Sequence, residues 1–240
     1  MKELMIIDVN DASRHAGAVQ LALQSDNCDL LGITVAWGGV PFPTALEQTC
    51  ELAGNLVPVY GGCPGPMARH IYQKKVRLPE PVQMPANVHR EHAVAYLVEA
   101  CRSAGRPVTM VALGPLTNIA MALRIAPDIA KKIHQILVVD ATDKLGYATE
   151  NLRRDPEAAQ ILLRSSVPVT IICLRDDVSP ACAVAGALDE HVFKQIEQVH
   201  VQVSLDRGLG AGALLHSKQL PPNARLVTQV DAIYCRADAQ

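Results

Sequence analysis

The chain has 240 residues, 49% of them hydrophobic and 3% aromatic, and its 22 lysines and arginines nearly balance 24 aspartates and glutamates. This length and apolar fraction allow a sizeable core and exclude disordered and fibrous proteins. Because no linker or repeat interrupts the pattern, we expect one domain over residues 1–240. A formal net charge of −2 leaves no positive field for a polyanion, so nucleic acid is not expected as a partner.

Local patterns exclude two further classes of protein. No apolar run approaches the roughly 18–20 residues needed to cross a bilayer, and the start, MKELMIIDVND, turns acidic where a signal peptide would still be apolar. We therefore expect no membrane partner and a cytoplasmic location. The seven cysteines are scattered without a C-x-x-C pair, which favours reduced, packed cysteines over a disulfide framework or a zinc site.

Short apolar strands alternate with helix-length amphipathic stretches along the first part of the chain. In chain order we expect a strand over residues 3–8, a helix from an N-cap at Asp11 or Ser13 to about residue 23, a strand over 30–36, a helix over 44–53 closed by Gly54, and a strand over 57–60. Residues 61–88, rich in proline and basic charge, are expected to form a long surface excursion, which in such folds is often a binding loop.

The same alternation continues beyond this excursion and predicts an α/β fold, with a mainly parallel sheet and helices on both faces. We expect a helix over residues 89–104, a strand over 108–113, a helix over 116–124, a strand over 136–140, a helix over 156–164 and a strand over 167–174. The pattern then predicts helices over 180–188 and 190–198 and strands over 200–205 and 225–230, joined by an irregular Gly/Ala-rich link.

Acidic side chains follow several of the predicted strands. Asp8 ends the first strand with Asp11 just beyond it, Asp140 ends the fifth, and Asp176 and Asp177 follow the sixth. Ligands of such folds bind at the carboxyl ends of strands, near the point where the strand order reverses. Carboxylates that converge there can hold a hard cation such as calcium or magnesium. The alternative is that each acid caps the helix that follows and stays solvated.

Several common catalytic motifs are absent from the sequence. No G-x-G-x-x-G opens a helix, and neither a Walker-type lysine loop nor a G-x-S-x-G elbow is present, which removes the main support for dinucleotide, nucleoside triphosphate and serine hydrolase functions. His89 and His92 lie one helical turn apart, as metal ligands can. Without a third ligand nearby, we interpret them as part of a solvated helix start.

Four segments match a known family in order and approximate spacing: LLGITVAWGGV, VPVYGG, VALGPLTNIAMAL and NLRRDPEAA. They resemble the inosine-uridine-preferring nucleoside hydrolases, whose pattern has a strand ending L-G-I-T-x-V-x-G-N, a P-V-Y-x-G strand, and the helix entries G-P-L-T-N-x-A and N-x-x-x-D-P-E-A-A. The match covers most of residues 1–174. The resemblance implies a nucleoside-hydrolase-type, Rossmann-like sandwich in a shortened form, and a homo-oligomer.

The resemblance also implies a chemistry. Family members cleave the N-glycosidic bond of nucleosides with a water activated on a bound calcium ion, which also clamps the ribose hydroxyls. The ion is held by an amino-terminal D-x-D-P-G-x-D-D cluster, the threonine carbonyl of L-T-N and the aspartate of a late H-D-P motif. By descent, the metal positions are Asn10, His15, Thr117 and Ser179, the catalytic position is Asn10, and the substrate-binding positions are Asp8, Asn10, His15 and Asn151.

This chain departs from the family pattern at the metal positions. Its amino-terminal cluster reads DVNDASRH, so the second aspartate, a ligand and proton acceptor in the family, is Asn10, and the closing acidic pair is Arg14-His15. An asparagine oxygen can coordinate calcium but cannot act as a base near neutral pH. Ser179 takes the aspartate position of the late motif, and Gly39 stands where the family has asparagine after the second strand.

Two functions from different classes remain open. The first is a family member whose calcium site is degraded, which uses no cofactor and binds a small molecule, such as a nucleoside or riboside, or a protein partner. The second is an active nucleoside or riboside N-ribohydrolase with a rearranged calcium site, with His15 as a neutral base. It requires new carboxylates to converge within metal-ligand reach, and the candidates are Asp8, Asp11, Asp176 and Asp177.

Overall fold

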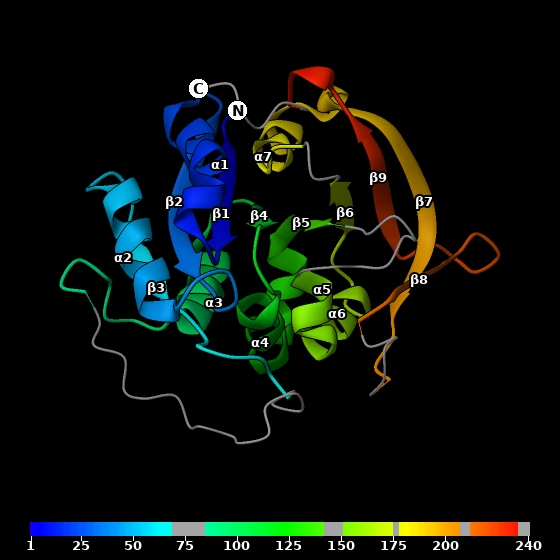
Figure 1. The fold of residues 1–240 in the computed structure, drawn as a ribbon, viewed down its shortest axis with the longest axis horizontal. Helices are drawn as coiled ribbons and strands as arrows, with labels where there is room; N and C mark the ends of the chain where they lie inside the picture. Colours follow the sequence, from blue (N-terminus) through cyan, green and yellow to red (C-terminus); the bar gives the residue numbers. More distant parts are fainter. Residues whose placement is uncertain (69–84, 142–150, 175–177, 207–211, 235–240) are drawn as a thin grey trace.

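The computed structural model describes residues 1–68, 85–141, 151–174, 178–206 and 212–234, and within them nine strands form one sheet (Figure 1). The strands are β1 (Glu3–Val9), β2 (Cys28–Val35), β3 (Val59–Gly61), β4 (Val108–Ala112), β5 (Ile133–Ala141), β6 (Val169–Leu174), β7 (Phe193–Val203), β8 (Leu214–Ser217) and β9 (Ala224–Val230). The helices are α1 (Ala12–Gln24), α2 (Phe42–Ala53), α3 (Ala93–Ser103), α4 (Thr117–Ile125), α5 (Asn151–Arg154), α6 (Pro156–Leu163) and α7 (Ala181–Leu188), with the 3-10 helices η1 (Pro127–Lys132), η2 (Glu190–Val192) and η3 (Ala232–Tyr234).

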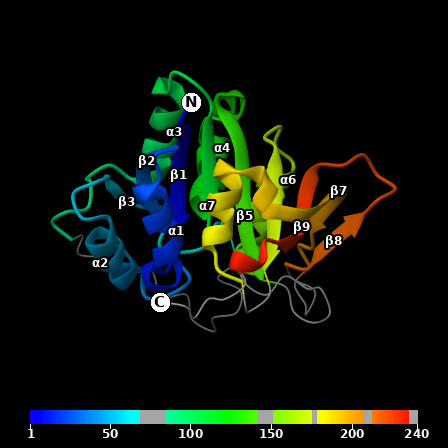
Figure 2. The same ribbon diagram turned by 90° about the horizontal axis from the view of Figure 1, so that it is seen from above.

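Helices cover both faces of the sheet. Helices α1, α2 and α7 pack on one face and α3, α4 and α6 on the other, so the molecule has three layers (Figures 1 and 2). Successive side chains of β1 point to opposite faces: Leu4 and Ile6 join the core under α3, α4 and α6, whereas Met5, Ile7 and Val9 join the core under α1, α2 and α7. A strand buried on both faces reads as a continuous apolar run, which is why β1 is recognisable in the sequence.

The strand order fixes where a ligand is expected. Within the described residues the order is β3-β2-β1-β4-β5-β6-β9-β7-β8, and the first six of these strands run parallel, as in doubly wound sheets. Strand β9 adds parallel to β6, and β7 and β8 follow antiparallel. The chain leaves β1 toward β2 on one side and β4 lies on the other, so the crevice between the carboxyl ends of β1 and β4 is the switch point. The predicted α/β fold is confirmed.

Local signals set the ends of the helices. Asp11 is the N-cap of α1, and its Oδ1 accepts the backbone N–H of Arg14 at 3.2 Å and the hydroxyl of Ser13 at 2.7 Å. Of the two predicted N-caps, Asp11 and Ser13, the structure therefore selects Asp11. Gly54 closes α2 with a φ of 56°, and Pro156 lies in the first turn of α6, both as predicted.

Replacement of the cap should be measurable on its own. Asp11→Ala will lower the free energy of unfolding by about 1 kcal/mol, because the first N–H groups of α1 lose their acceptor. The matched control is Asp26→Ala, which removes the same charge from an exposed position beyond the other end of α1 and will change stability by less than about 0.5 kcal/mol. Urea denaturation followed by circular dichroism measures both, and equal losses would contradict the capping role.

The prediction of a helix over residues 190–198 is wrong. Only a short 3-10 helix forms at its start, and β7 then pairs antiparallel with β9. The register shifts between Phe193 and Gln195 and again between Gln195 and Ile196, so irregular pairing interrupts the alternation of side chains. As a result, the apolar residues Phe193, Ile196 and Val199 recur at three-residue intervals, which imitates a helical face.

The helix predicted over residues 89–104 begins later, at Ala93. His92 is its N-cap, with Nδ1 accepting the backbone N–H of Val94 at 3.2 Å. His89 instead extends the sheet, because its N–H donates to the carbonyl of Val59 on β3 at 2.8 Å. The two histidines therefore have separate local roles.

Strand β8 and helix α5 are elements that the sequence pattern does not indicate. The surface excursion predicted over residues 61–88 lies largely outside the described residues, because 69–84 are not described. Within the described ranges, no helix combines the length and the apolar composition that crossing a membrane requires.

Candidate functional site

Asp8 lies near the carboxyl end of β1, at the switch point, and is 2% exposed. Its Oδ1 accepts the hydroxyl of Thr34 on β2 and the side-chain Nδ2 of Asn118 on α4, the latter at 2.8 Å. Its Oδ2 is buried and has no hydrogen-bond partner among the described residues. A buried acceptor without a partner is costly, so a water or a ligand hydroxyl is the expected partner of this oxygen.

Burial raises the pKa of Asp8 to about 7, because desolvation outweighs the hydrogen bonds from Thr34 and Asn118 that favour the ionised form. Near neutral pH the carboxyl group therefore populates both protonation states. When ionised, the free oxygen Oδ2 can accept a hydrogen bond, and when protonated the carboxyl group can donate one. A carboxyl group tuned to this range at a switch point is a functional-site signal.

Asn118 holds Asp8 in place from the start of α4. Its Oδ1 accepts the backbone N–H of Cys63 at 2.8 Å, and its Nδ2 also donates to the carbonyl of Val35 at 3.2 Å. Gly62 leaves the space for this amide, since a Cβ there would lie 2.2 Å from Oδ1 of Asn118. The side chain thus ties β1, β2 and the loop after β3 together.

A second run of hydrogen bonds joins the loops beside the crevice. Trp37 donates its Nε1–H to Oγ1 of Thr117 at 3.0 Å, and the hydroxyl of Thr117 donates to Oδ2 of Asp155 at 2.7 Å. Asp155 is fully buried, and it also accepts the backbone N–H groups of Met67 at 3.0 Å and Ala158 at 3.1 Å. Burial raises the pKa of Asp155. The loop after β2 and the starts of α4 and α6 are locked together by these bonds.

Asn10 follows β1, is 4% exposed, and is confined by two glycines. A Cβ on Gly39 would lie 2.6 Å from the carbonyl oxygen of Asn10, and a Cβ on Gly114 would lie 3.0 Å from the Cβ of Asn10. The loops after β2 and β4 therefore close on Asn10 from two sides, which places this predicted site residue in the crevice.

Asn151 begins α5 and reaches the same edge of the sheet. Its Nδ2 donates to the carbonyls of Leu113 and Val139, both at 2.9 Å, while its buried Oδ1 has no partner among the described residues. The N–H of Leu113 donates to the carbonyl of Asp8 at 2.8 Å, so Asn151 and Asp8 are linked through one residue. The carboxylate of Asp140 accepts backbone N–H groups at the start of α5 and fixes this helix.

His15 lies on α1 and is 3% exposed, with an Nδ1 that has no partner within the described residues. Burial and the neighbouring charge of Arg14 lower the pKa of His15 to about 4, so the imidazole is neutral at neutral pH. No hydrogen bond in the described part of the chain joins His15 to Asp8 or Asn151. The structure thus groups Asp8, Asn10 and Asn151 and leaves His15 on the adjoining helix.

Comparison with known proteins identifies the family to which a chain with this fold and these motifs belongs. A family model described as inosine-uridine preferring nucleoside hydrolase matches residues 5–179. The chain belongs to this family. It is 32% identical over 187 residues to the pyrimidine-specific ribonucleoside hydrolase RihB of Escherichia coli (strain SE11), an alignment that covers 72% of this chain and 60% of that protein. With RihB of Escherichia coli O17:K52:H18 it shares 29% identity over 238 residues, which cover 90% of this chain and 76% of the relative.

Solved structures of nucleoside hydrolases share the fold. An inosine-guanosine nucleoside hydrolase superposes with a TM-score of 0.85 at 19% identity, covering 98% of this chain and 97% of the other. A purine-preferring ribonucleoside hydrolase from Gardnerella vaginalis gives a TM-score of 0.82 at 21% identity, covering 95% and 94%. The likeness thus extends to the carboxyl-terminal strands, beyond the residues that the family model matches.

The oxygen ligands that the described residues offer at the crevice do not fit the calcium ion that the nucleoside hydrolase family implies. Calcium takes about six to eight oxygen ligands, commonly with several carboxylates. Here Asp8 contributes one free carboxylate oxygen, and Asn10 and Asn151 contribute only amides. Within the described ranges, no three His, Cys, Asp or Glu side chains gather closely enough to hold a metal ion. The neutral His15 adds no negative charge.

Two other strand-end acids, Asp11 and Asp140, act as helix caps in this chain. Hydrogen bonds from Ser13 and from the backbone of Arg14 outweigh desolvation and hold the pKa of Asp11 below its ordinary value. Asp140 accepts backbone N–H groups of α5 in the same way. For these two acids the structure agrees with the second of the two predictions made for strand-end carboxylates, namely that they cap the helices that follow.

The predicted metal position Ser179 lies at the start of α7. Its Oγ accepts the backbone N–H of Ala181 at 3.3 Å, and its own N–H donates to the carbonyl of Tyr234 at 2.8 Å. Asp176 and Asp177 lie outside the described residues. The rearranged ligand set that includes them therefore stays a prediction.

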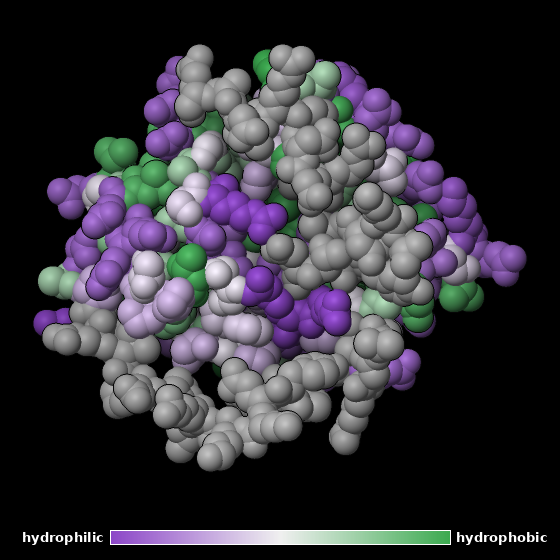
Figure 3. Space-filling view, in the orientation of Figure 1, coloured by the Kyte–Doolittle hydropathy of each residue, from purple (hydrophilic) through white to green (hydrophobic). Residues whose placement is uncertain are grey.

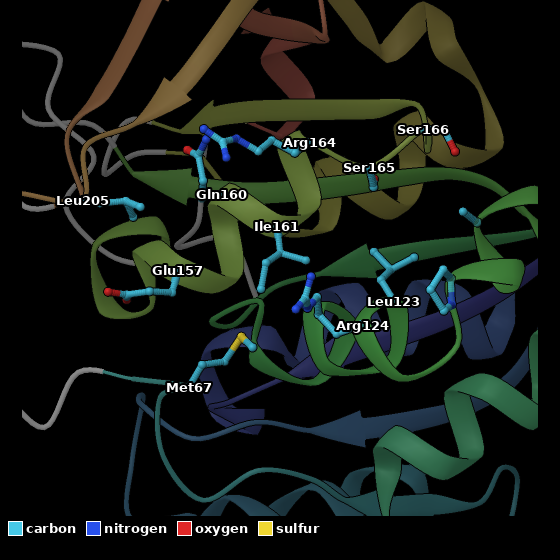
Figure 4. Close-up of a pocket in the computed structure, with 12 residues that line it drawn as sticks. Met67, Leu123, Arg124, Glu157, Gln160, Ile161, Arg164, Ser165, Ser166 and Leu205 are labelled. Carbon is cyan, nitrogen blue, oxygen red and sulfur yellow. The ribbon is translucent and has the colours of Figure 1, made fainter.

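A separate cavity of about 660 Å³ runs along the groove between α4 and α6 (Figure 4). Apolar side chains of Met67, Leu123 and Ile161 line it, together with Arg124 and Arg164. None of the residues predicted for the site lines this cavity. Because the unpartnered acceptors lie at the strand ends, we place the candidate site in the crevice and not in this groove.

Sequence reasoning missed three residues that shape the crevice. Asn118 and Asp155 stand inside the motifs G-P-L-T-N and N-x-x-x-D-P-E, so a signal for them was present. Thr34 carries no such signal, because its contact with Asp8 follows only from the pairing of β1 with β2. For Thr117 the sequence suggested a role of the carbonyl, and the structure shows a hydrogen-bonded hydroxyl.

Proposed function

We propose that this member of the nucleoside hydrolase family binds a riboside and does not hydrolyse it with a calcium-activated water. The observation that supports this function most strongly is the pair of buried acceptors, Oδ2 of Asp8 and Oδ1 of Asn151, which have no partner among the described residues. Both belong to one crevice at the switch point of the sheet, the usual ligand position in this architecture.

The chemistry of the two acceptors suits a sugar. Neighbouring hydroxyls of a ribose ring can donate to Oδ2 of Asp8 and Oδ1 of Asn151, and each satisfied acceptor removes a penalty on the order of 1–3 kcal/mol. Donation by a hydroxyl favours the ionised form of Asp8, so binding will lower its pKa below about 7 and release protons near neutral pH.

The same residues argue against hydrolysis through the family's route. Cleavage by water needs a group that accepts the water's proton, and Asn10, at the position of the family's base, cannot do so. In the proposed complex the free oxygen of Asp8 is engaged by the ligand. The relatives named RihB are pyrimidine-specific ribonucleoside hydrolases, which makes uridine the first ligand to test.

The test is a titration of uridine into the protein in the presence of EDTA, followed by calorimetry and by the fluorescence of Trp37, the single tryptophan. We expect one-to-one binding without calcium and no release of uracil, measured by chromatography, with or without added calcium. Asn151→Ala will weaken binding by about tenfold or more. The control is Asn27→Ala, an exposed position at the opposite edge of the sheet, which will leave the affinity unchanged.

Two results would overturn the proposal. Calcium-dependent release of uracil would identify an active ribohydrolase with a rearranged metal site. Failure of uridine, inosine and ribose to bind to the folded protein would show that the crevice does not recognise ribosides.

A further inference from the structure

Arg154, the last residue of α5, reaches across the crevice to the loop after β2. A Cβ on Gly38 would lie 3.0 Å from Nη1 of Arg154 and 3.2 Å from its Cδ, and 3.1 Å from the ring of Pro115. Gly38 also has a φ of 113°, a conformation that favours glycine. The bare backbone of Gly38 therefore lets the arginine side chain lie against this loop, between the exits of β2 and β4.

Among the described residues, the guanidinium of Arg154 has no anionic partner. Arg154 is half-buried, and no carboxylate within the described ranges forms an ion pair with it. Two acids near α5 are engaged elsewhere: Asp155, the next residue along the chain, with Thr117 and two backbone N–H groups, and Asp140 with the start of α5. A half-buried arginine with unused donors at the edge of a ligand crevice is suited to binding an anion.

Arg154 lies on the same short helix as Asn151, which carries one of the two unpartnered acceptors. Asn151 and Arg154 are the first and last residues of α5, and side chains three apart lie on one side of a helix with Cβ atoms about 5–6 Å apart. Both reach toward the exit of β4, Asn151 to Leu113 and Arg154 to Pro115. A single sugar ring with a charged substituent can bridge this separation. Figure 3, which views the carboxyl-end edge of the sheet, shows hydrophilic residues gathered near its middle.

We propose that the ligand of this crevice is a phosphorylated riboside and that Arg154 binds its phosphate group. The inference rests on the proposed riboside-binding function and adds the charge of the ligand to it. Ring hydroxyls donate to Asp8 and Asn151, while the guanidinium donates two parallel hydrogen bonds to phosphate oxygens. An acceptor at one end of the crevice and a cation at the other hold the ligand in one orientation.

The experiment compares uridine with uridine 5′-monophosphate, and ribose with ribose 5-phosphate, by calorimetry in EDTA. In the parent chain we expect the phosphorylated ligand to bind about tenfold or more tightly, with a ratio that falls as ionic strength rises. Arg154→Gln will bring the ratio close to one, and Arg154→Lys will restore part of it through charge alone. Arg153→Gln, which removes the same charge from the neighbouring exposed residue that packs against Gly212, will leave the ratio unchanged.

The outcomes separate this inference from the function on which it rests. Equal affinity of the parent for uridine and its phosphate ester would overturn the phosphate inference and leave riboside binding intact. An equal drop in the ratio for the Arg153 and Arg154 variants would also overturn it, because it would assign the effect to overall charge. Absence of binding by every ligand would reject both. Circular dichroism verifies that each variant is folded.

Discussion

The Asp8→Asn variant will gain about 3 kcal/mol in free energy of unfolding, relative to the parent chain, as the pH rises from about 4 to about 7. In the parent, the folded state keeps a proton on Asp8 up to about pH 7, whereas the unfolded chain releases it near 3.8. The folded state thus binds more protons in this window, and its stability declines as the pH rises. Asparagine does not titrate, so the variant lacks this decline.

His15 provides a control in which the pH dependence of stability has the opposite sign. Its pKa falls from 6.5 in the unfolded chain to about 4 in the folded one, so the unfolded state binds more protons between these values and stability falls as the pH is lowered. His15→Gln will therefore lose about 3 kcal/mol relative to the parent as the pH rises from 4 to 6.5. Urea denaturation at a series of pH values measures both variants. Three parallel stability curves would contradict the assigned protonation states.

Gly62→Ala will destabilise the protein by about 3 kcal/mol or more and weaken ligand binding with it. The new Cβ would lie 2.2 Å from Oδ1 and 2.4 Å from Nδ2 of Asn118, so this amide must move. Its displacement breaks the hydrogen bonds to Asp8, Cys63 and Val35 and leaves the carboxyl group of Asp8 with one donor fewer.

The matched control is Gly105→Ala, a glycine whose added Cβ would meet nothing within 4 Å. It will change the free energy of unfolding by less than about 0.5 kcal/mol. Chemical denaturation of the two variants, together with a uridine titration, measures the difference. Similar stability of the two variants would show that Asn118 does not hold the crevice together.

The parallel part of the fold could be predicted because its signals are local. Strands buried on both faces are continuous apolar runs, as in residues 30–36, and caps such as Asp11 and Gly54 mark helix ends. Strand β7 could not be predicted in this way. Its irregular register is set by pairing with β9, for instance Phe193 with Val230, and a local window of sequence does not contain the partner strand.

The same distinction applies to the candidate site. The motifs pointed to Asp8, Asn10 and Asn151, and the structure brings these three side chains to one crevice, while their role in binding remains a proposal. The bond between Asn118 and Asp8 spans 110 residues, so it depends on the finished sheet. Whether a strand-end acid caps a helix, as Asp11 does, or faces the crevice, as Asp8 does, follows from the exact length of the strand and loop around it.

The central position of β1 has a consequence for synthesis and folding. Among the strands described, β1 is synthesised before the others. Strand β2 covers one of its edges early, but the other edge pairs with β4, which comes from Val108–Ala112. Until then the nascent chain exposes an open edge on an apolar strand, a feature that invites pairing with other chains. Because parallel pairings between distant segments form slowly, we expect refolding of the full chain to be slow and to be limited at high concentration by aggregation.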